Sequence, residues 1–180
     1  KNTLDTVTQL KPDRIALYSY AHMPQLFKAQ NKIDVLSLPN QTLKLSLFQM
    51  AVDFLMSHGY EYIGMDHFAL PTDELFKAKE SGDLHRNFMG YTTRKQTDLI
   101  GFGVSSISQI ADTFSQNAKD IVSWQNQIEK GSLATVRGIT TNTDDQIRAE
   151  VIQAIMCQGT VYFRDFEQRH NIQFCQYFSD

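Results

Sequence analysis

The sequence has 180 residues, enough for one hydrophobic core or one and a half small domains, and its apolar share of 42% is ordinary for a globular protein. The formal net charge of −3 argues against a nucleic-acid-binding protein, because such proteins usually carry a basic surface. The longest apolar stretch, LFQMAVDFLM, is interrupted by Gln49 and Asp53, so the sequence predicts no membrane span.

The two cysteines, Cys157 and Cys175, bear on the cellular compartment. Two thiols in a chain of this length favour a reducing compartment without a disulfide framework, so we expect a cytoplasmic location. The sequence contains neither C-x-x-C nor H-E-x-x-H, so these cysteines predict no metal site of their own. Residues 1–20 lack the charged start and apolar block of a secretory signal, and we expect none.

The first part of the chain alternates between helices and strands. In chain order we expect a helix through Leu4, Val7 and Leu10, a strand over 14–20, a helix from about Pro39 to Gly59, a strand over 60–65 and a helix from Thr72. Pro39 suits a first helical turn, Gly59 suits a left-handed helix end, and Asp73 and Glu74 suit the positive end of the last helix. This order predicts an α/β fold with parallel strands. The apolar face of the long helix comprises Leu43, Leu47, Met50, Ala51, Phe54 and Leu55.

The pattern changes after residue 84. The segment 84–108 is rich in glycine, threonine and aromatic residues, and we expect a strand within DLIGFGVSSIS. Further along we expect a helix over about 117–130, a strand in LATVRGIT and a helix from 144 to Gly159. Thr143 and Gln146 fit a capping box at the start of that last helix. We therefore expect two domains, residues 1–112 and residues 113–180, of which the second is mostly helical.

Three segments are candidates to lie at the carboxyl edge of the predicted sheet. Ligands of parallel α/β proteins lie at the carboxyl ends of the strands. The segments YSYAHMP, GMDHFALP and GFGVSSIS each combine a strand end with small or polar residues. We expect the three segments to meet along one rim, where the sequence predicts a ligand site.

Several polar residues near these strand ends could carry chemistry. Asp66 could hold His67 as a base, but adjacent residues on a strand point to opposite faces and then need not touch. His22 could have a functional role or could make a structural hydrogen bond. Arg86, which follows His85, could bind carboxylates through its planar donors or form an ordinary solvated pair.

The aromatic segment NFMGYTT and the glycines of GFG could also contribute to a ligand site. Phe88, Met89 and Tyr91 surround a glycine, which favours a loop folded over a ligand, although buried loop packing is the alternative. The GFG glycines could let a backbone approach a ligand closely. Ser106 replaces the third glycine of a dinucleotide-binding motif, so that motif is incomplete.

Four segments, YSYAHMP, YIGMDHFALPTDEL, LHRNFMGYTT and TDLIGFGVSSIS, resemble the oxygen-independent coproporphyrinogen III oxidase family in their order and spacing. These are radical S-adenosylmethionine (SAM) enzymes of heme biosynthesis. The resemblance implies that a reduced [4Fe-4S] cluster cleaves SAM to methionine and a 5′-deoxyadenosyl radical. The radical then removes hydrogen from a propionate of coproporphyrinogen III, which loses carbon dioxide and an electron to become a vinyl group. Two propionates react and give protoporphyrinogen IX.

The resemblance also implies roles for individual residues. Ala21 and Ile107 match positions that line a SAM site, and Phe88 and Met89 match a loop near the cofactors and substrate. Some members carry glutamine at the position of Met89, and a thioether cannot reproduce the hydrogen bonds of an amide. A polar role at this position is therefore in question for this chain.

For the substrate, coproporphyrinogen III, we expect contacts from His67 and Arg86. The resemblance assigns no chemical step to Asp66 or His67, and no catalytic residue is predicted. Neither the electron donor nor the oligomeric state follows from the sequence.

The C-x-x-x-C-x-x-C motif that holds the cluster in this family is absent from the sequence. Cys157 and Cys175 are 18 residues apart and cannot replace it. We therefore expect the cluster ligands to lie outside this chain. Residues 1–112 would be the later part of a partial, parallel-stranded radical SAM barrel, and residues 113–180 part of a C-terminal domain. The helical start and the aromatic end also favour a piece of a longer protein, inactive on its own.

Two alternatives stay open beside the oxidase. The first is a related heme-binding chaperone without oxidase activity, for which His22, His67 or His85 could be an axial ligand. The second is a self-contained α/β domain with unrelated small-molecule chemistry, because fold alone does not fix function.

Overall fold

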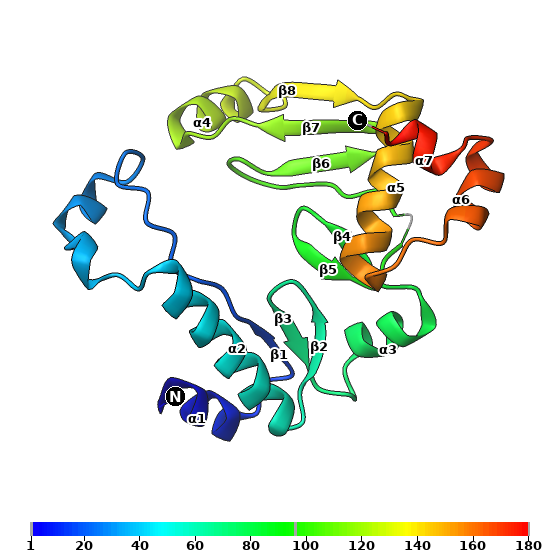
Figure 1. Cartoon of the computed structure of the whole chain (residues 1–180). Helices are drawn as coiled ribbons and strands as arrows, with labels where there is room; N and C mark the ends of the chain where they lie inside the picture. Colours follow the sequence, from blue (N-terminus) through cyan, green and yellow to red (C-terminus); the bar gives the residue numbers. More distant parts are fainter. Residues whose placement is uncertain (1, 96, 180) are drawn as a thin grey trace. The chain divides into compact units, whose positions relative to one another are not determined.

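The computed structural model describes residues 2–95 and 97–179 (Figure 1). The chain forms two compact units, Lys1–Ser81 and Gly82–Asp180. Each unit has its own sheets and helices and is described by itself.

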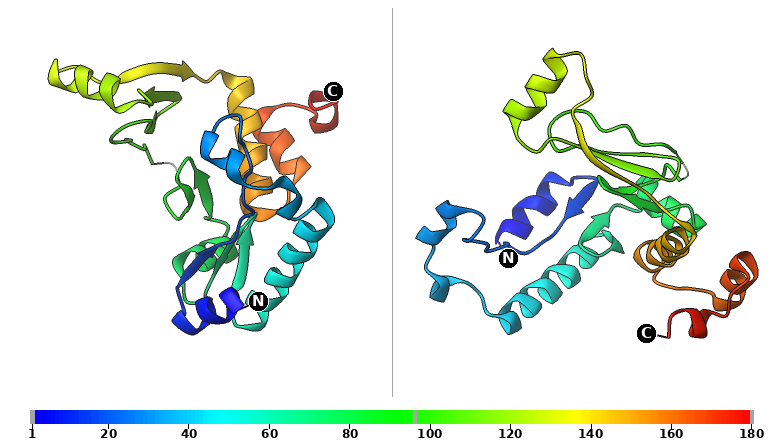
Figure 2. Two further views of the ribbon diagram at one scale, coloured as in Figure 1. Left: turned by 90° about the vertical axis from the view of Figure 1, so that its left-hand side faces the viewer. Right: turned by 90° about the horizontal axis from the view of Figure 1, so that it is seen from above.

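The first unit contains one small sheet with helices against it. Its elements are α1 (Asn2–Leu10), β1 (Arg14–Ala16), the short 3-10 helices η1 (Lys28–Lys32) and η2 (Val35–Ser37), α2 (Gln41–Ser57), β2 (Glu61–Gly64), β3 (His67–Ala69) and α3 (Glu74–Ser81). Leu55, Tyr60 and Phe68 form the buried centre of the unit. The segment between β1 and α2 runs away from the sheet before the chain returns along α2 (Figures 1 and 2).

The strands of the first unit do not pair as expected. The sheet has the order β1-β3-β2, and β3 is antiparallel to both neighbours. The strands expected at 14–20 and 60–65 therefore run in the same direction but are separated by a third strand. Met65 adopts φ 50°, and the turn that it forms with Asp66 sends His67–Ala69 back between them. Parallel pairing of the two strands was the wrong prediction, because the segment read as a strand exit is a tight hairpin.

Helix α2 begins and ends close to the expected residues. Asn40 caps it by accepting a hydrogen bond from the N–H of Leu43 at 2.9 Å, so the helix starts after Pro39 and not at it. Gly59 follows the helix with φ 86°, which confirms the left-handed end. Of the expected apolar face, Ala51 and Leu55 in the C-terminal half are buried, whereas Leu43 and Leu47 nearer the start of the helix are exposed.

The second unit contains a two-stranded hairpin, a three-stranded sheet and four helices in its described residues. Its elements are β4 (His85–Asn87), β5 (Gly90–Thr92), β6 (Ile107–Ile110), β7 (Thr113–Asn117), α4 (Ile121–Glu129), β8 (Thr135–Thr140), α5 (Thr143–Gln158), α6 (Phe163–His170) and α7 (Phe174–Tyr177). The sheets are β4-β5 and β6-β7-β8. Every strand pair among residues 2–95 and 97–179 is antiparallel.

Several expectations for the second unit need correction. The strand in DLIGFGVSSIS begins only at Ile107, after a bend at Gly103 and a turn at Val104 and Ser105. The helix expected from 117 begins at Ile121, after a strand that ends at Asn117. The strand in LATVRGIT is confirmed as β8, and Gly159 ends α5 in the left-handed conformation.

The start of α5 shows a capping box one residue earlier than expected. Asn142 accepts from the N–H of Asp145 at 2.9 Å, and the Asp145 carboxylate accepts from the N–H of Asn142 at 3.0 Å. Thr143 and Gln146 do not make this box, since Thr143 is already helical.

The mixed α/β content is confirmed. The expected domain boundary between residues 112 and 113 falls inside the second unit, between β6 and β7, and stays a prediction.

Candidate functional site

Asp66 and His67 are in direct contact at the turn between β2 and β3. Nδ1 of His67 lies 2.6 Å from Oδ1 of Asp66, and both side chains are about three-quarters buried. Asp66 belongs to the turn and not to the strand, which is why the two side chains need not point to opposite faces. The N–H of Leu17 donates to the Asp66 carbonyl at 2.7 Å, so the ends of two expected strands lie side by side.

The contact with Asp66 fixes the roles of the two ring nitrogens of His67. An ionised carboxylate can only accept hydrogen bonds, so Nδ1 carries the proton that it donates to Asp66. In the neutral ring, Nε2 is then an acceptor. This is the arrangement in which a carboxylate orients an imidazole for acid–base or binding work.

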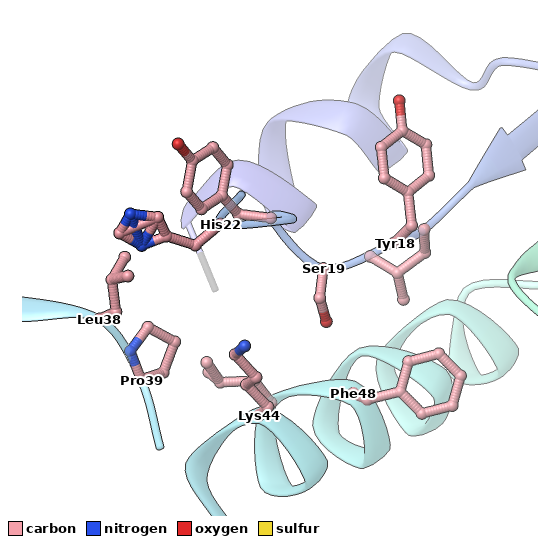
Figure 3. Close-up of a pocket in the computed structure, with 10 residues that line it drawn as sticks. Tyr18, Ser19, His22, Leu38, Pro39, Lys44 and Phe48 are labelled. Carbon is pink, nitrogen blue, oxygen red and sulfur yellow. The ribbon is translucent and has the colours of Figure 1, made fainter. Parts of the chain in front are cut away.

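A cavity of about 210 Å³ lies in the first unit beside this strand end (Figure 3). Its wall combines the strand exit with the N-terminal part of α2, and its lining is Leu17, Tyr18, Ser19, Tyr20, His22, Leu38, Pro39, Lys44, Leu47 and Phe48. The side chains of Ser19 and Lys44 point toward one another across it (Figure 3). Nε2 of His22 is buried and has no hydrogen-bond partner among the described residues. The cavity offers one cation and several aromatic surfaces.

Ala21 lies beside this cavity but does not line it. Its carbonyl accepts from Nε2 of Gln30 at 3.2 Å, and Oε1 of Gln30 accepts from the N–H of Met23 at 2.5 Å. One side-chain amide thus holds the loop from both sides and leaves Ala21 exposed. Sequence reasoning missed Gln30, because nothing in its local pattern marks this bridge.

The segment NFMGYTT forms a hairpin in the second unit. Asn87 pairs with Gly90, so Phe88 and Met89 are its two tip residues. Oδ1 of Asn87 accepts from the N–H of Met89 at 2.8 Å, and Gly90 has φ 127°, a conformation that favours glycine. Met89 is 85% exposed. The Phe88 ring meets Phe114 of β7 edge to face, with centroids 5.5 Å apart.

Arg86 is the middle residue of β4 in the same hairpin. Its guanidinium lies over the Tyr91 ring, 5.5 Å from the centroid, and its Nε is buried without a hydrogen-bond partner among the described residues. Burial lowers the pKa of His85, and Lys95 lowers it further. Burial also raises the pKa of the Cys157 thiol, against the opposing charges of Arg86 and Lys95. The surroundings of Arg86 are therefore cationic and partly desolvated, which suits a carboxylate.

Ile107 begins β6, and its carbonyl group lies close to Gly101 of the GFG segment. A Cβ at Gly101 would lie 2.6 Å from the Ile107 carbonyl oxygen, so a side chain there would displace the start of β6. The Gly101 N–H also donates to Oγ of Ser108 at 3.0 Å. The first glycine of GFG therefore serves close backbone packing inside the chain.

Comparisons with known proteins bear on these residues. No protein-family model matches the chain. An oxygen-independent coproporphyrinogen III oxidase of Pseudomonas aeruginosa is 47% identical over 178 residues, which are 99% of this chain and 39% of the relative. The chain is homologous to part of the oxygen-independent coproporphyrinogen III oxidases. The Synechocystis oxidase is 40% identical over 180 residues, 100% of this chain and 39% of its own length.

A solved coproporphyrinogen III oxidase matches in structure as well. The Escherichia coli oxidase, described as a radical SAM enzyme, superposes with a TM-score of 0.93 at 44% identity, covering 99% of this chain and 41% of that one. The family resemblance read from the four segments is thus confirmed. The chain spans about two fifths of the length of these oxidases.

The expected site residues are divided between the two units. Ala21 and His67 belong to the first unit, and Arg86, the hairpin tip and Ile107 belong to the second. The structure joins the first two strand ends at Leu17 and Asp66. That all three strand ends meet at one rim stays a prediction.

The residues present do not fit an iron–sulfur cluster. Such a cluster is held by four thiolates or a closely related set. The chain has two cysteines, of which Cys157 is buried and Cys175 exposed. Within residues 2–95 and 97–179, no three histidine, cysteine, aspartate or glutamate side chains gather as metal ligands.

Over the same residues, no helix has the length and apolar character needed to cross a membrane.

Proposed function

We propose that this chain is part of an oxygen-independent coproporphyrinogen III oxidase. The enzyme would oxidatively decarboxylate two propionates of coproporphyrinogen III to vinyl groups and give protoporphyrinogen IX. The near-complete match of the chain to oxidases of this name, at up to 47% identity and a TM-score of 0.93, carries the proposal. SAM, cleaved reductively at a [4Fe-4S] cluster, would supply the oxidising radical, and the cluster ligands would lie outside this chain.

We place residues 1–112 in the later part of a radical SAM barrel and residues 113–180 in a C-terminal domain. The superposition of the chain on a solved oxidase described as a radical SAM enzyme, with a TM-score of 0.93, supports this placement. The solved oxidase is matched over only 41% of its chain, which leaves room for the other strands.

For SAM, the contacts would come from Ala21, Ile107, Phe88 and Met89. Ala21 is small and exposed in a braced loop, which suits close approach of a nucleoside. Met89 presents an exposed thioether, which can give apolar contact but no strong hydrogen bond. We expect Met89 to act by packing.

For the substrate carboxylates, the contacts would come from His67 and Arg86. Arg86 carries a permanent charge in partly desolvated surroundings, where an ion pair is stronger than in water. The hydrogen bond to Asp66 orients the imidazole of His67 at the turn between β2 and β3. We also propose a cytoplasmic location, because free cysteines suit a reducing compartment.

Anaerobic reconstitution tests the proposal. A full-length protein that carries this sequence should bind about four irons per chain and convert coproporphyrinogen III to protoporphyrinogen IX in the presence of SAM and a reductant. Chain 1–180 alone, treated in the same way, should bind no cluster and form no product. A full-length protein that loads its cluster but leaves the porphyrinogen unchanged would refute the oxidase.

A heme titration of the same full-length protein separates the oxidase from a heme-carrying relative. The oxidase should give no tight Soret shift. A tight shift that disappears on His22→Ala, His67→Ala or His85→Ala would favour heme carriage instead.

A further inference from the structure

The side chain of Gln153 connects helix α5 to the hairpin β4-β5 by two hydrogen bonds. The Arg86 N–H donates to Oε1 of Gln153 at 3.0 Å, and Nε2 of Gln153 donates to the Arg86 carbonyl at 2.5 Å. The side-chain amide thus satisfies both backbone groups of one residue of β4, as a neighbouring strand would. Cys157, one turn further along α5, lies with Sγ 3.5 Å from the same Oε1.

A second contact holds the other strand of the hairpin. Oη of Tyr91 donates to the Met156 carbonyl at 2.8 Å, and the Tyr91 side chain is buried. Arg86 and Tyr91 are opposite each other in the register of the hairpin. Gln153 and Met156 are three residues apart, so they lie on one face of the helix. The two contacts form a clamp across both strands, directly below the tip.

The hairpin depends on such external contacts for its position. In the described residues, β4 and β5 form a sheet of two strands only. A two-stranded hairpin is marginally stable in water by itself. At its tip, the Phe88 ring contacts the Phe114 ring of β7. The clamp and this ring contact therefore help to hold the tip that carries Met89.

We propose that Gln153 and Tyr91 are positioning residues that fix the hairpin tip for SAM. This inference rests on the proposed function, because it requires the tip to contact the cofactor. Neither residue reaches the tip itself, and each acts through the backbone or base of the hairpin. Loosening the clamp displaces Phe88 and Met89 without altering either side chain.

The test uses the full-length, cluster-loaded protein with Gln153→Met and Tyr91→Phe. The first removes both amide bonds at similar volume, and the second removes only the hydroxyl. Exposed residues of the same types supply the matched controls, Gln158→Met and Tyr162→Phe. Hydrogen exchange of the Arg86 amide and the KM for SAM are measured for each variant.

We expect faster exchange at Arg86 in Gln153→Met, and a KM for SAM raised about tenfold to a hundredfold in both clamp variants, because small misplacements of a binding group are costly. Iron content should match the wild type. Gln153→Glu keeps an acceptor for the Arg86 N–H and should give an intermediate KM. If Gln153→Met folds poorly, Gln153→Glu is measured in its place. The control variants should keep wild-type exchange and KM.

The outcomes separate the clamp from the oxidase. Unchanged KM in Tyr91→Phe and Gln153→Glu would overturn the positioning role, even if stability falls. Unchanged exchange at Arg86 in a folded Gln153→Met protein would overturn the clamp itself. A wild-type protein with a loaded cluster and no oxidase activity would instead refute the proposed function, while the exchange data would still report whether the clamp holds the hairpin.

Discussion

The carboxylate of Asp66 and the imidazole of His67 share a 2.6 Å hydrogen bond although the residues are adjacent in sequence. The bond exists because the chain turns at Met65, where φ is 50°, and places Asp66 outside the strand that begins at His67. A carboxylate in this position selects one tautomer of the ring. The same turn puts β3 between β1 and β2.

The tautomer of His67 can be measured directly. At a pH where the ring is neutral, we expect the proton on Nδ1, seen in the nitrogen chemical shifts of the imidazole. Asp66→Asn removes the negative charge that favours this tautomer, so the Nε2–H form should become populated. A wild-type ring with its proton mainly on Nε2 would contradict the assigned contact.

The two tip residues of the hairpin should differ in their effect on stability. Phe88→Ala loses the ring contact with Phe114 and should lower the free energy of unfolding by about 1 kcal/mol. Met89→Ala, at an exposed position, should change it by less than about 0.5 kcal/mol. Urea unfolding of the protein measures both, and equal effects would show that the tip is not braced as described.

Asp73 should matter more than its neighbour Glu74, although both bind Arg14. The side chain of Asp73 is 8% exposed, pairs with Nε of Arg14 at 2.8 Å and accepts from the N–H of Leu75 at 2.7 Å. Asp73→Ala should lower the free energy of unfolding by about 1–2 kcal/mol, since a helix cap is lost with the ion pair. Glu74 is 67% exposed, and Glu74→Ala should cost about 0.5 kcal/mol or less. The reverse order in denaturant unfolding would contradict this assignment.

His85 should make the protein less stable in mild acid. Its pKa is lowered in the folded state by burial and by Lys95, so the unfolded chain binds the proton more readily. Stability is then full above the unfolded pKa of about 6.5 and falls as the pH drops below it. The urea midpoint should decrease from pH 7.5 to 5.5, and the decrease should be smaller in His85→Asn. An equal decrease in that variant would exclude His85 as a source.

Local signals in the sequence determined much of the element order. The periodicity of α2, its end at Gly59, strand β8 and the end of α5 at Gly159 all follow from residues close to one another in the chain. The segments around Ala21, His67, Phe88 and Ile107 were sufficient to predict the family, because such runs are specific in order and spacing.

Only the tertiary structure decided how strands pair and which side chains support the candidate site. The return of His67–Ala69 between β1 and β2 depends on the left-handed conformation of Met65. A methionine does not predict that conformation, because positive φ is uncommon for residues other than glycine. The amides of Gln30 and Gln153 bind backbone groups 7 to 67 residues away. Such bonds leave no periodic trace in a sequence, because they depend on the folded positions of the partners and not on local spacing.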